Sequence, residues 1–188
     1  MKVLLDACVL YPTVLREILI GVAGAGLYTP LWSDRILEEW ARATRKLGPE
    51  AEMLARGDIA RLRANWPDAV VAATPGLEAR LHLPDENDIH VLAAAIAGHA
   101  DVILTFNAGD FPRHILTDEG VERRDPDGFL WQIWSDAPDK VGAVVETVRA
   151  EAERLSGRPQ SLRALLKRAR LPRLGKAMTG NGPRTCPN

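Results

Sequence analysis

The chain has 188 residues, of which 46% are hydrophobic and 26% are charged, with 24 Lys+Arg against 25 Asp+Glu. Its mean hydropathy is −0.11, and no apolar run approaches the roughly 18 residues of a membrane-spanning helix, which excludes a membrane-spanning protein. Two cysteines, Cys8 and Cys186, are too few for a disulfide-rich secreted domain. Because Asp6 interrupts the apolar start before an export signal can form, we expect a cytoplasmic protein.

The charge is divided unevenly along the chain. Residues 151–188 contain nine Lys and Arg against two Glu, a net charge of +7, so residues 1–150 carry −8. A basic segment can bind phosphate groups by displacing their counterions, but it is equally typical of a solvated helix and tail. Charge by itself therefore admits a nucleic-acid partner without requiring one.

Short apolar runs alternate with longer stretches of helical periodicity, which predicts an α/β fold with a parallel sheet and crossover helices. The predicted elements, in chain order, are a strand at 3–5, a helix at 13–25, a strand at 28–31, helices at 33–47 and 51–65, a strand at 69–73, a helix at 85–98, strands at 102–105 and 121–123, and helices at 129–134, 140–155 and 161–170. We expect the strand at 121–123 to lie at an edge of the sheet.

Polar side chains follow two of the predicted buried strands. Asp6 ends the first strand, and Asn107 and Asp110 follow the strand at 102–105. Sites in open parallel sheets form outside the carboxyl ends of the strands, which makes these residues candidates for a functional site. Taken singly, each is also a common turn former.

Asp88 lies in the first turn of the helix at 85–98. It shares one helix face with Val91, Leu92 and Ala95, which stand three, four and seven residues further on. The carboxylate therefore points where core residues point, and a buried anion needs a partner. The alternative is a capping bond back to the helix start. We favour the functional role.

Two neighbouring glutamates on the helix at 33–47 are separated by the same angular argument. Glu39 falls at the border of the apolar stripe that contains Trp40, whereas Glu38 falls on the solvent side. Glu39 can therefore reach a cleft, and Glu38 is expected to be a surface charge.

Carboxylates gathered at one edge of a sheet repel one another unless a cation compensates them. Oxygen donors without a Cys/His cluster favour Mg²⁺ or Mn²⁺ over Zn²⁺. Four histidines show no metal-ligand spacing and are expected at the surface or at the rim of a site: His82, His90, His99 and His114.

Four segments, taken together and in this order, match a known family. They are residues 4–10 (LLDACVL), 33–40 (SDRILEEW), 85–88 (DEND) with the alanine-rich helix that follows, and 105–111 (TFNAGDF). With these segments the chain resembles the PIN-domain ribonucleases, and more narrowly the VapC-like toxins of bacterial toxin–antitoxin pairs.

The resemblance implies a PIN-like three-layer α/β/α sandwich with a central, mainly parallel sheet and added C-terminal helices. It also implies an endoribonuclease that uses Mg²⁺ or Mn²⁺, with water as nucleophile and a 5′-phosphate product. Asp6, Asp88 and the loop after the strand at 102–105 would hold one or two ions, and Glu39 would orient the water.

The fourth acidic position of the family is less clear in this chain. The family commonly shows Thr-x-Asp-x-Asp-Phe in this segment. Here Asn107 replaces the first aspartate, and one extra residue precedes Asp110. Either side chain can complete the site. The candidate catalytic residues are thus Asp6, Glu39, Asp88 and Asp110, and the candidate metal ligands are Asp6, Asp88, Asn107 and Asp110.

The expected partners are an RNA substrate, such as tRNA or another structured RNA, a cognate antitoxin implied by the resemblance, and a second copy in a homodimer. We expect a nuclease domain over residues 1–125, a helical extension over 126–172 and a disordered tail over 173–188. The candidate contacts for the substrate, besides the basic tail, are Arg16, Arg35, Thr105 and Arg113.

Specific residues exclude two other enzyme classes and leave one non-enzymatic function open. A thiol phosphatase built on Cys8 needs Cys-x5-Arg, but Val14 stands where the arginine is required. A haloacid-dehalogenase-type phosphatase needs Asp-x-Asp after the first strand, and Cys8 occupies the second position. A non-catalytic PIN-fold module that binds RNA or protein stays open, because Asn107 carries no charge.

Overall fold

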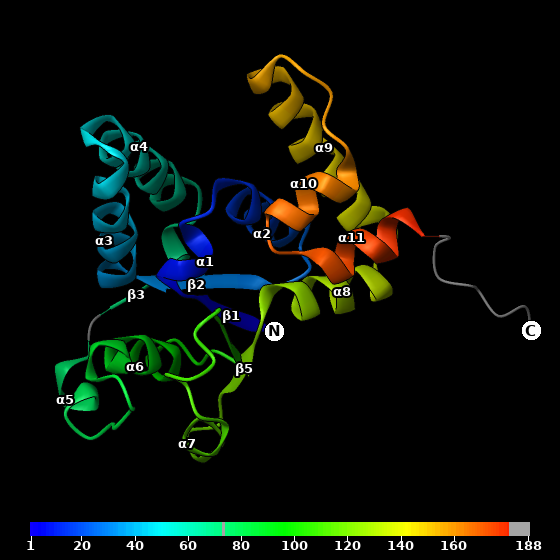
Figure 1. Ribbon diagram of the computed structural model, residues 1–188. Coiled ribbons are helices and arrows are strands. Elements are labelled where there is room, and N and C mark those ends of the chain that lie inside the picture. Colours follow the sequence, from blue (N-terminus) through cyan, green and yellow to red (C-terminus); the bar gives the residue numbers. More distant parts are fainter. Residues whose placement is uncertain (73, 181–188) are drawn as a thin grey trace, which may run out of the picture. The chain divides into compact units, whose positions relative to one another are not determined.

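The computed structural model describes residues 1–72 and 74–180, and the chain forms two compact units (Figure 1). The sheet unit contains residues 1–11 and 28–124, and the helical unit contains residues 12–27 and the chain from residue 125 on. Helix α2 (Thr13–Gly24), which we expected within a nuclease domain of residues 1–125, groups with the C-terminal helices.

The sheet unit is built on five parallel strands in the order β3-β2-β1-β4-β5. The central strand β1 and its neighbour β4 consist almost entirely of buried aliphatic side chains, a composition typical of parallel strands that are covered on both faces. The predicted parallel α/β class is confirmed, and the last strand lies at an edge as expected. The strands are β1 (Lys2–Leu5), β2 (Thr29–Ser33), β3 (Val70–Val71), β4 (Val102–Leu104) and β5 (Glu122–Arg124).

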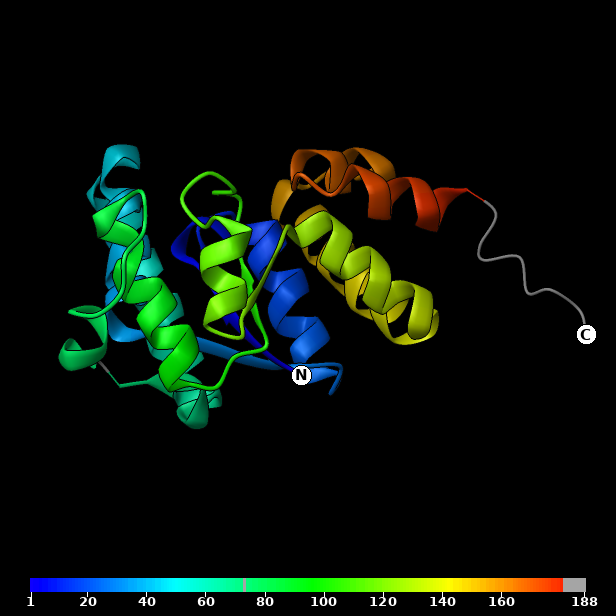
Figure 2. The same cartoon turned by 90° about the horizontal axis from the view of Figure 1, so that it is seen from below.

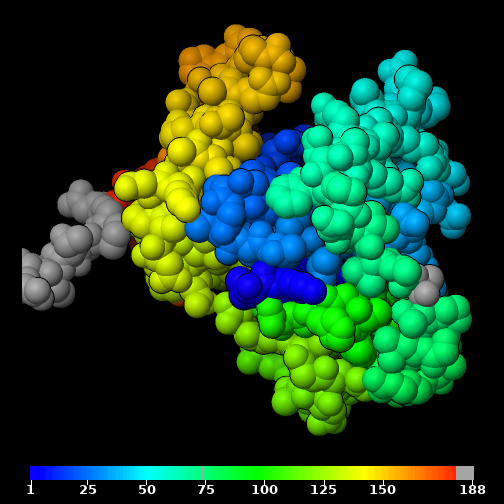
Figure 3. All heavy atoms as spheres, turned by 180° about the vertical axis from the view of Figure 1, so that it is seen from behind, coloured from blue at the N-terminus to red at the C-terminus, as the bar shows by residue number. Residues whose placement is uncertain are grey.

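Helices lie on both sides of this sheet, so the expected three-layer α/β/α arrangement is confirmed (Figure 1). Figure 2 shows α6 and α7 in front of the sheet, and Figure 3 shows the start of the chain, in deep blue, at the surface of the sheet unit. One side carries α1 (Ala7–Leu10), α3 (Asp34–Ala43) and α4 (Pro49–Asn65), and the other carries α5 (Pro75–Glu78), α6 (Ile89–Ala97) and α7 (Arg113–Asp118).

Two helices that carry site residues are shorter than the periodicity predicted. Helix α3 starts where the Ser33 hydroxyl accepts a hydrogen bond from the amide of Ile36 at 3.2 Å, and it ends at Ala43, before a 3-10 helix over Thr44–Leu47. The helix expected at 85–98 begins as a 3-10 turn over Glu86–Asp88 and becomes α6 only at Ile89. The helices α1, α5 and α7 were not predicted, because four to six residues are too few to show a helical period.

The helical unit contains α2, α8 (Pro126–Asp136), α9 (Pro138–Ser156), α10 (Leu162–Arg168) and α11 (Pro172–Thr179). Helix α2 approaches α9 closely at Gly21, where an added Cβ would lie 2.6 Å from Cγ1 of Val144. No helix within residues 1–72 and 74–180 is both long enough and apolar enough to cross a membrane.

Helix α11 occupies residues that we expected in a disordered tail starting at 173. The Asp127 carboxylate accepts hydrogen bonds from the amides of Arg173 and Leu174 at 2.8 and 2.9 Å, which satisfies the free N–H groups of the first turn. Leu174 is fully buried, and the Arg173 guanidinium lies 3.7 Å from the ring centre of Trp131 on α8. Figure 2 shows α11 beside α8 and α10. The remainder of the expected tail, residues 181–188, lies outside the described residues.

The Asp127→Ala substitution is expected to loosen α11, because two backbone donors lose a charged acceptor from α8. The loss should be about 1–2 kcal/mol in the local opening free energy of α11, measured by native-state hydrogen exchange. The matched control is Asp136→Ala, which removes an exposed carboxylate from the other end of α8. Equal exchange of the α11 amides in the two variants would contradict the capping role.

Candidate active site

The candidate site lies at the carboxyl ends of the neighbouring strands β1 and β4 of the sheet unit. Leu5 of β1 and Leu104 of β4 are paired, so the residues that follow them, Asp6 and Thr105, leave the sheet side by side. Both are buried, with exposed fractions of 4% and 2%. A buried carboxylate is unfavourable unless hydrogen-bond donors surround it.

Two neighbouring side chains supply donors to Asp6. The Thr105 hydroxyl donates to Oδ2 of Asp6 at 2.6 Å, and the Cys8 thiol donates to the same oxygen at 3.0 Å. The Thr105 oxygen in turn accepts from the amide of Asn107 at 3.0 Å. Thr105, considered above as a substrate contact, is therefore engaged with Asp6 and the loop backbone. The sequence order alone did not reveal this role for Cys8 or Thr105, because the two residues are 97 positions apart.

The Cys8 thiol is held in its protonated form. Burial and the charge of Asp6 raise the pKa of Cys8 from 9.0 to about 12, against the lowering effect of the Phe106 amide, which donates to Sγ at 3.3 Å. A thiol with this pKa donates a hydrogen bond and is a poor nucleophile. The local chemistry thus agrees with the exclusion of a thiol phosphatase.

Cys8 is expected to resist alkylation. In a Cys186→Ser background with EDTA present at pH 8, iodoacetamide should modify Cys8 at least about a hundredfold more slowly than a free thiol, since the thiolate is scarce. In urea the same residue should react at the rate of a free thiol. Rapid labelling of the folded protein would contradict the protonated state.

Asp88 is half-buried and lies near several other acids. Burial raises the pKa of Asp88 from 3.8 to about 6, and nearby negative charges add to the effect. Asp88 makes no side-chain capping bond at the start of α6, so the capping alternative is not observed. The charges that act on Asp88, in decreasing order, are those of Asp6, Asp110, Asp85 and Glu39. The other three acids predicted as catalytic residues, Asp6, Asp110 and Glu39, are thus near enough to Asp88 to act on it electrostatically.

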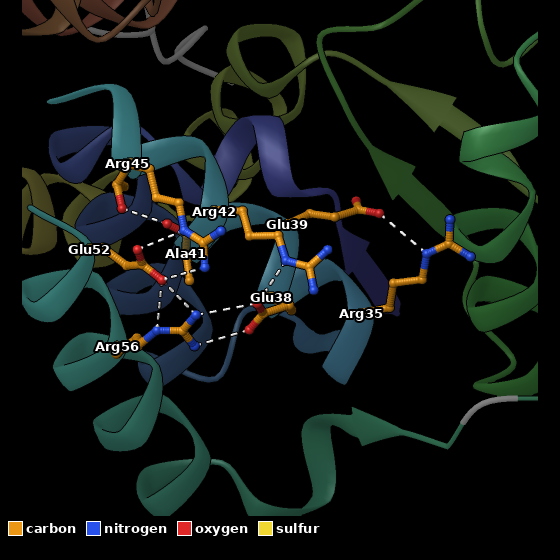
Figure 4. A network of polar contacts seen from close by, with 9 residues as sticks. Arg35, Glu38, Glu39, Ala41, Arg42, Arg45, Glu52 and Arg56 are labelled. Carbon is orange, nitrogen blue, oxygen red and sulfur yellow. Dashed lines mark hydrogen bonds and ion pairs between the residues drawn. The ribbon is translucent and has the colours of Figure 1, made fainter. Parts of the chain in front are cut away.

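The glutamates of α3 are about equally exposed, at 35% for Glu38 and 37% for Glu39, which the helix geometry did not predict, and they differ in their partners (Figure 4). Glu38 is bound by Arg42 and Arg56, and these hydrogen bonds lower the pKa of Glu38 to about 2. Glu39 is only half-buried, with Oε1 at 3.4 Å from Nε of Arg35 and 2.9 Å from Nε2 of His90.

His90 is buried, with an exposed fraction of 4%, so the prediction of a surface or rim position was wrong for this histidine. The reason is that α6 is apolar on nearly all sides, with every residue from His90 to Ala95 buried. On such a helix the hydrophobic period does not mark a solvent face. The other three histidines, His82, His99 and His114, are exposed.

The loop after β4 presents Asp110 and Asn107 differently. Asp110 is half-buried and acts electrostatically on Asp88, whereas Asn107 is exposed. The loop is held by the fully buried Phe111 and by the Arg123 guanidinium, which donates to the carbonyl of Ala108. Asp110 therefore contributes a charge near Asp88, whereas Asn107 carries none, so both alternatives for the fourth position stay open.

The arginines considered as substrate contacts lie in different places. Arg35 is exposed at the start of α3, and its Nη2 donates to the carbonyl of Asn87 at 3.3 Å. Arg113 is exposed in α7. Arg16 belongs to α2 of the helical unit and is buried, with Nε 3.6 Å from Oε1 of Glu17. Arg35 is therefore the candidate that contacts a site acid.

The candidate metal ligands have oxygen donors that suit a hard divalent cation, but their side chains are not arranged around a single metal position. In the part of the chain that the structure describes, no group of three or more His, Cys, Asp or Glu side chains is arranged to hold a metal ion. Burial, and after it the negative charge of the neighbouring carboxylates, raises the pKa of Asp88, and oxygen donors of this kind prefer Mg²⁺ or Mn²⁺. Binding of an ion would require the acids to draw closer.

Comparison with known proteins gives one match. A family model described as a PIN domain matches residues 2–109, which is more than half of the chain. The matched range contains Asp6, Glu39 and Asp88 and ends one residue before Asp110. No curated protein and no solved structure matches the chain.

Proposed function

Because this chain belongs to the PIN-domain family, whose members are generally nucleases, we propose that it is a metal-dependent endoribonuclease. The observation that carries the proposal is the environment of Asp88, whose pKa is raised first by burial and then by the charges of other acids, among them the residue after β1, Glu39 of α3 and Asp110 of the loop after β4. An acid with a shifted pKa close to other acids is typical of a catalytic site. In this proposal Asp6, Asp88 and Asp110 hold Mg²⁺ or Mn²⁺, with Asn107 as an additional oxygen donor.

In this proposal each residue around the acids has its own role in cleavage. A bound ion supplies compensation for the negative charge that builds on the scissile phosphate. Thr105 and Cys8 keep the Asp6 carboxylate in one orientation through hydrogen bonds to Oδ2. Glu39 orients the attacking water and accepts its proton, and Arg35, 3.4 Å from Glu39, attracts the RNA phosphate.

The test is cleavage of RNA by the purified full-length protein. We expect single-stranded and tRNA-like RNA to be cut with Mg²⁺ or Mn²⁺ to give 5′-phosphate and 3′-hydroxyl ends, with no cleavage in EDTA or by Asp6→Asn. Ends with a 2′,3′-cyclic phosphate would contradict water as the nucleophile. Cleavage that persists in EDTA would contradict the need for a metal.

A second candidate function is a PIN-fold module that binds RNA or protein without cutting. It is favoured by Asn107 at an expected acidic position and by the absence of a ready three-residue metal cluster among residues 1–72 and 74–180. RNA binding that survives Asp6→Asn, together with no metal binding by calorimetry, would establish this function in place of the nuclease.

We further propose that the protein is the toxin of a toxin–antitoxin pair that acts in the cytoplasm, on the support of the four sequence segments at 4–10, 33–40, 85–88 and 105–111. Expression of the chain alone should arrest growth, and Asp6→Asn should relieve the arrest. A small gene for a DNA-binding protein directly upstream should encode an antitoxin that restores growth and captures the chain, alone or as a dimer. Growth that continues during expression of folded wild-type protein would contradict this role.

A further inference from the structure

The segment that follows α9 carries a dense positive charge. Residues 157–180 contain seven Lys and Arg and no Asp or Glu. They form α10 and α11 of the helical unit and the turns beside these helices (Figure 1). All seven cationic side chains are exposed and together define what we call the basic surface: Arg158, Arg163, Lys167, Arg168, Arg170, Arg173 and Lys176.

The helix geometry explains why these side chains face the solvent. In α10, Arg163 and Lys167 both lie about 160° around the helix axis from the buried Leu165. In α11, Lys176 stands in the same relation to the buried Leu174. The leucines therefore hold the two helices in the helical unit, and the outer sides of the helices are left to the cations.

Carboxylates do not compensate most of this charge. In α9, directly before the segment, Arg149 lies 2.7 Å from Glu146 and Arg154 lies 2.6 Å from Glu151. The arginines drawn around α3 and α4 in Figure 4 are likewise paired with glutamates. Six cations of the basic surface make no ion pair with any residue in the ranges 1–72 and 74–180: Arg158, Arg163, Lys167, Arg168, Arg173 and Lys176.

Two of these arginines are held in place by neutral partners. The Arg168 guanidinium donates to Oε1 of Gln160, and the Arg173 guanidinium lies 3.7 Å from the ring centre of Trp131. The Asp127 carboxylate accepts from backbone amides at the start of α11 and not from a cationic side chain. A guanidinium that is oriented by a neutral group keeps its full charge and most of its N–H donors, so it can still bind a phosphate group.

The arrangement favours a polyanion over a lipid surface as the partner. Like charges stand four residues apart at Arg163 and Lys167 and three apart at Arg173 and Lys176, and their repulsion is relieved when an anion binds beside them. A helix that binds a membrane needs exposed apolar side chains next to its cations. The leucines at 165, 166, 171 and 174 are instead buried inside the unit.

We propose that the basic surface binds the phosphate backbone of the RNA substrate without reading its sequence. The inference rests on the proposed nuclease function for the identity of the polyanion. Cations that displace the counterions of RNA supply affinity, and contacts to phosphates carry no sequence information. The basic surface should therefore act on KM for RNA and leave kcat unchanged.

The binding test does not depend on cleavage. Binding of the full-length protein to fluorescein-labelled oligouridine is measured in EDTA by fluorescence anisotropy over a series of KCl concentrations. The test variant combines Arg163→Gln, Lys167→Gln and Lys176→Gln. Its affinity should fall at least about tenfold at about 0.1 M salt, and the slope of log K against log salt should fall by about 2, because each phosphate contact on a single strand contributes about 0.7.

The matched control combines Arg42→Gln, Arg61→Gln and Lys140→Gln, which remove the same charge from exposed positions outside the basic surface. It should bind oligouridine within about twofold of wild type. Equal weakening of the two variants would show that only net charge matters and would overturn the proposal, as would unchanged binding by the test variant. Binding to phosphatidylserine vesicles that is lost in the test variant, with RNA affinity intact, would assign the surface to a membrane instead.

Cleavage assays separate this proposal from the nuclease function. With Mn²⁺ the test variant should cut RNA with KM raised at least about fivefold and kcat unchanged. A KM equal to that of wild type would overturn the role of the basic surface. If the wild-type protein bound oligouridine through the basic surface but cut no RNA, only the nuclease function would be overturned.

Discussion

The Asp88→Asn substitution is expected to abolish RNA cleavage and, without divalent metal, to make the protein more stable at neutral pH. Burial and neighbouring acids raise the pKa of Asp88 to about 6 in the folded protein, compared with 3.8 for a solvated carboxyl. The folded state therefore binds the proton more tightly than the unfolded state. The resulting destabilisation is absent below about pH 4, grows as the pH rises and is complete above about pH 7.

The size of this effect follows from the same shift. Two pKa units correspond to roughly 3 kcal/mol, and because Asp88 is only half-buried, solvent screening reduces the expected gain of Asp88→Asn to about 1–2 kcal/mol at pH 7.5. Urea unfolding in EDTA at pH 7.5 and at pH 4 measures it, and the gain should vanish at the lower pH. The matched control is Glu86→Gln, which removes the same charge two residues away from an exposed position.

Divalent metal should reverse the order of stability. If the site binds Mn²⁺ as proposed, Mn²⁺ should raise the melting temperature of wild type far more than that of Asp88→Asn, which lacks one of the proposed carboxylate ligands. If Asp88→Asn were less stable than wild type in EDTA, or gained as much from Mn²⁺, Asp88 would not be an uncompensated acid of a metal site.

The second large effect is expected at Thr105. Thr105→Val keeps the shape of the side chain but removes the hydroxyl that donates to the buried Asp6 carboxylate at 2.6 Å and accepts from the Asn107 amide. Loss of a hydrogen bond to a buried charged group should cost about 1.5–3 kcal/mol in the free energy of unfolding. Cleavage should fall at least about tenfold, because Asp6 and the loop that carries Asp110 both lose a fixed position.

Thr105→Ser is the matched control, since serine retains the hydroxyl. It should recover most of the stability and most of the cleavage rate, with kcat affected more than KM in the valine variant. Similar stability and activity of the valine and serine variants would show that the hydroxyl does not position Asp6.

Much of the site was predictable because it depends on short-range patterns. An aspartate directly after an apolar run marks the carboxyl end of a buried strand, and this places Asp6. The apolar helix that follows Asp88 drew attention to this residue rather than to the exposed Glu86, although Asp88 lies in a 3-10 turn and is the N-cap of α6 instead of a first-turn residue. The angle between consecutive helical residues singled out Glu39 from Glu38, although the two are about equally exposed and differ in their partners, which for Glu38 are Arg42 and Arg56.

The positions that escaped prediction share a different physical cause. His90 sits on a helix with no polar face, so no periodicity could place it. The support of Asp6 by Thr105 depends on the pairing of β1 with β4, which joins residues 99 positions apart. The cap that Asp127 gives to α11 likewise joins residues 46 and 47 positions apart.

By itself the sequence determined the parallel α/β class, the approximate place of each strand and longer helix, and which acids are candidates for the site, because local apolar periods encode which face of an element is buried. Only the tertiary structure decided which donors surround Asp6, that His90 is buried beside Glu39, and that α2 groups with the C-terminal helices. These outcomes follow from packing and strand pairing between distant segments, and no local pattern records which distant segment a side chain will meet.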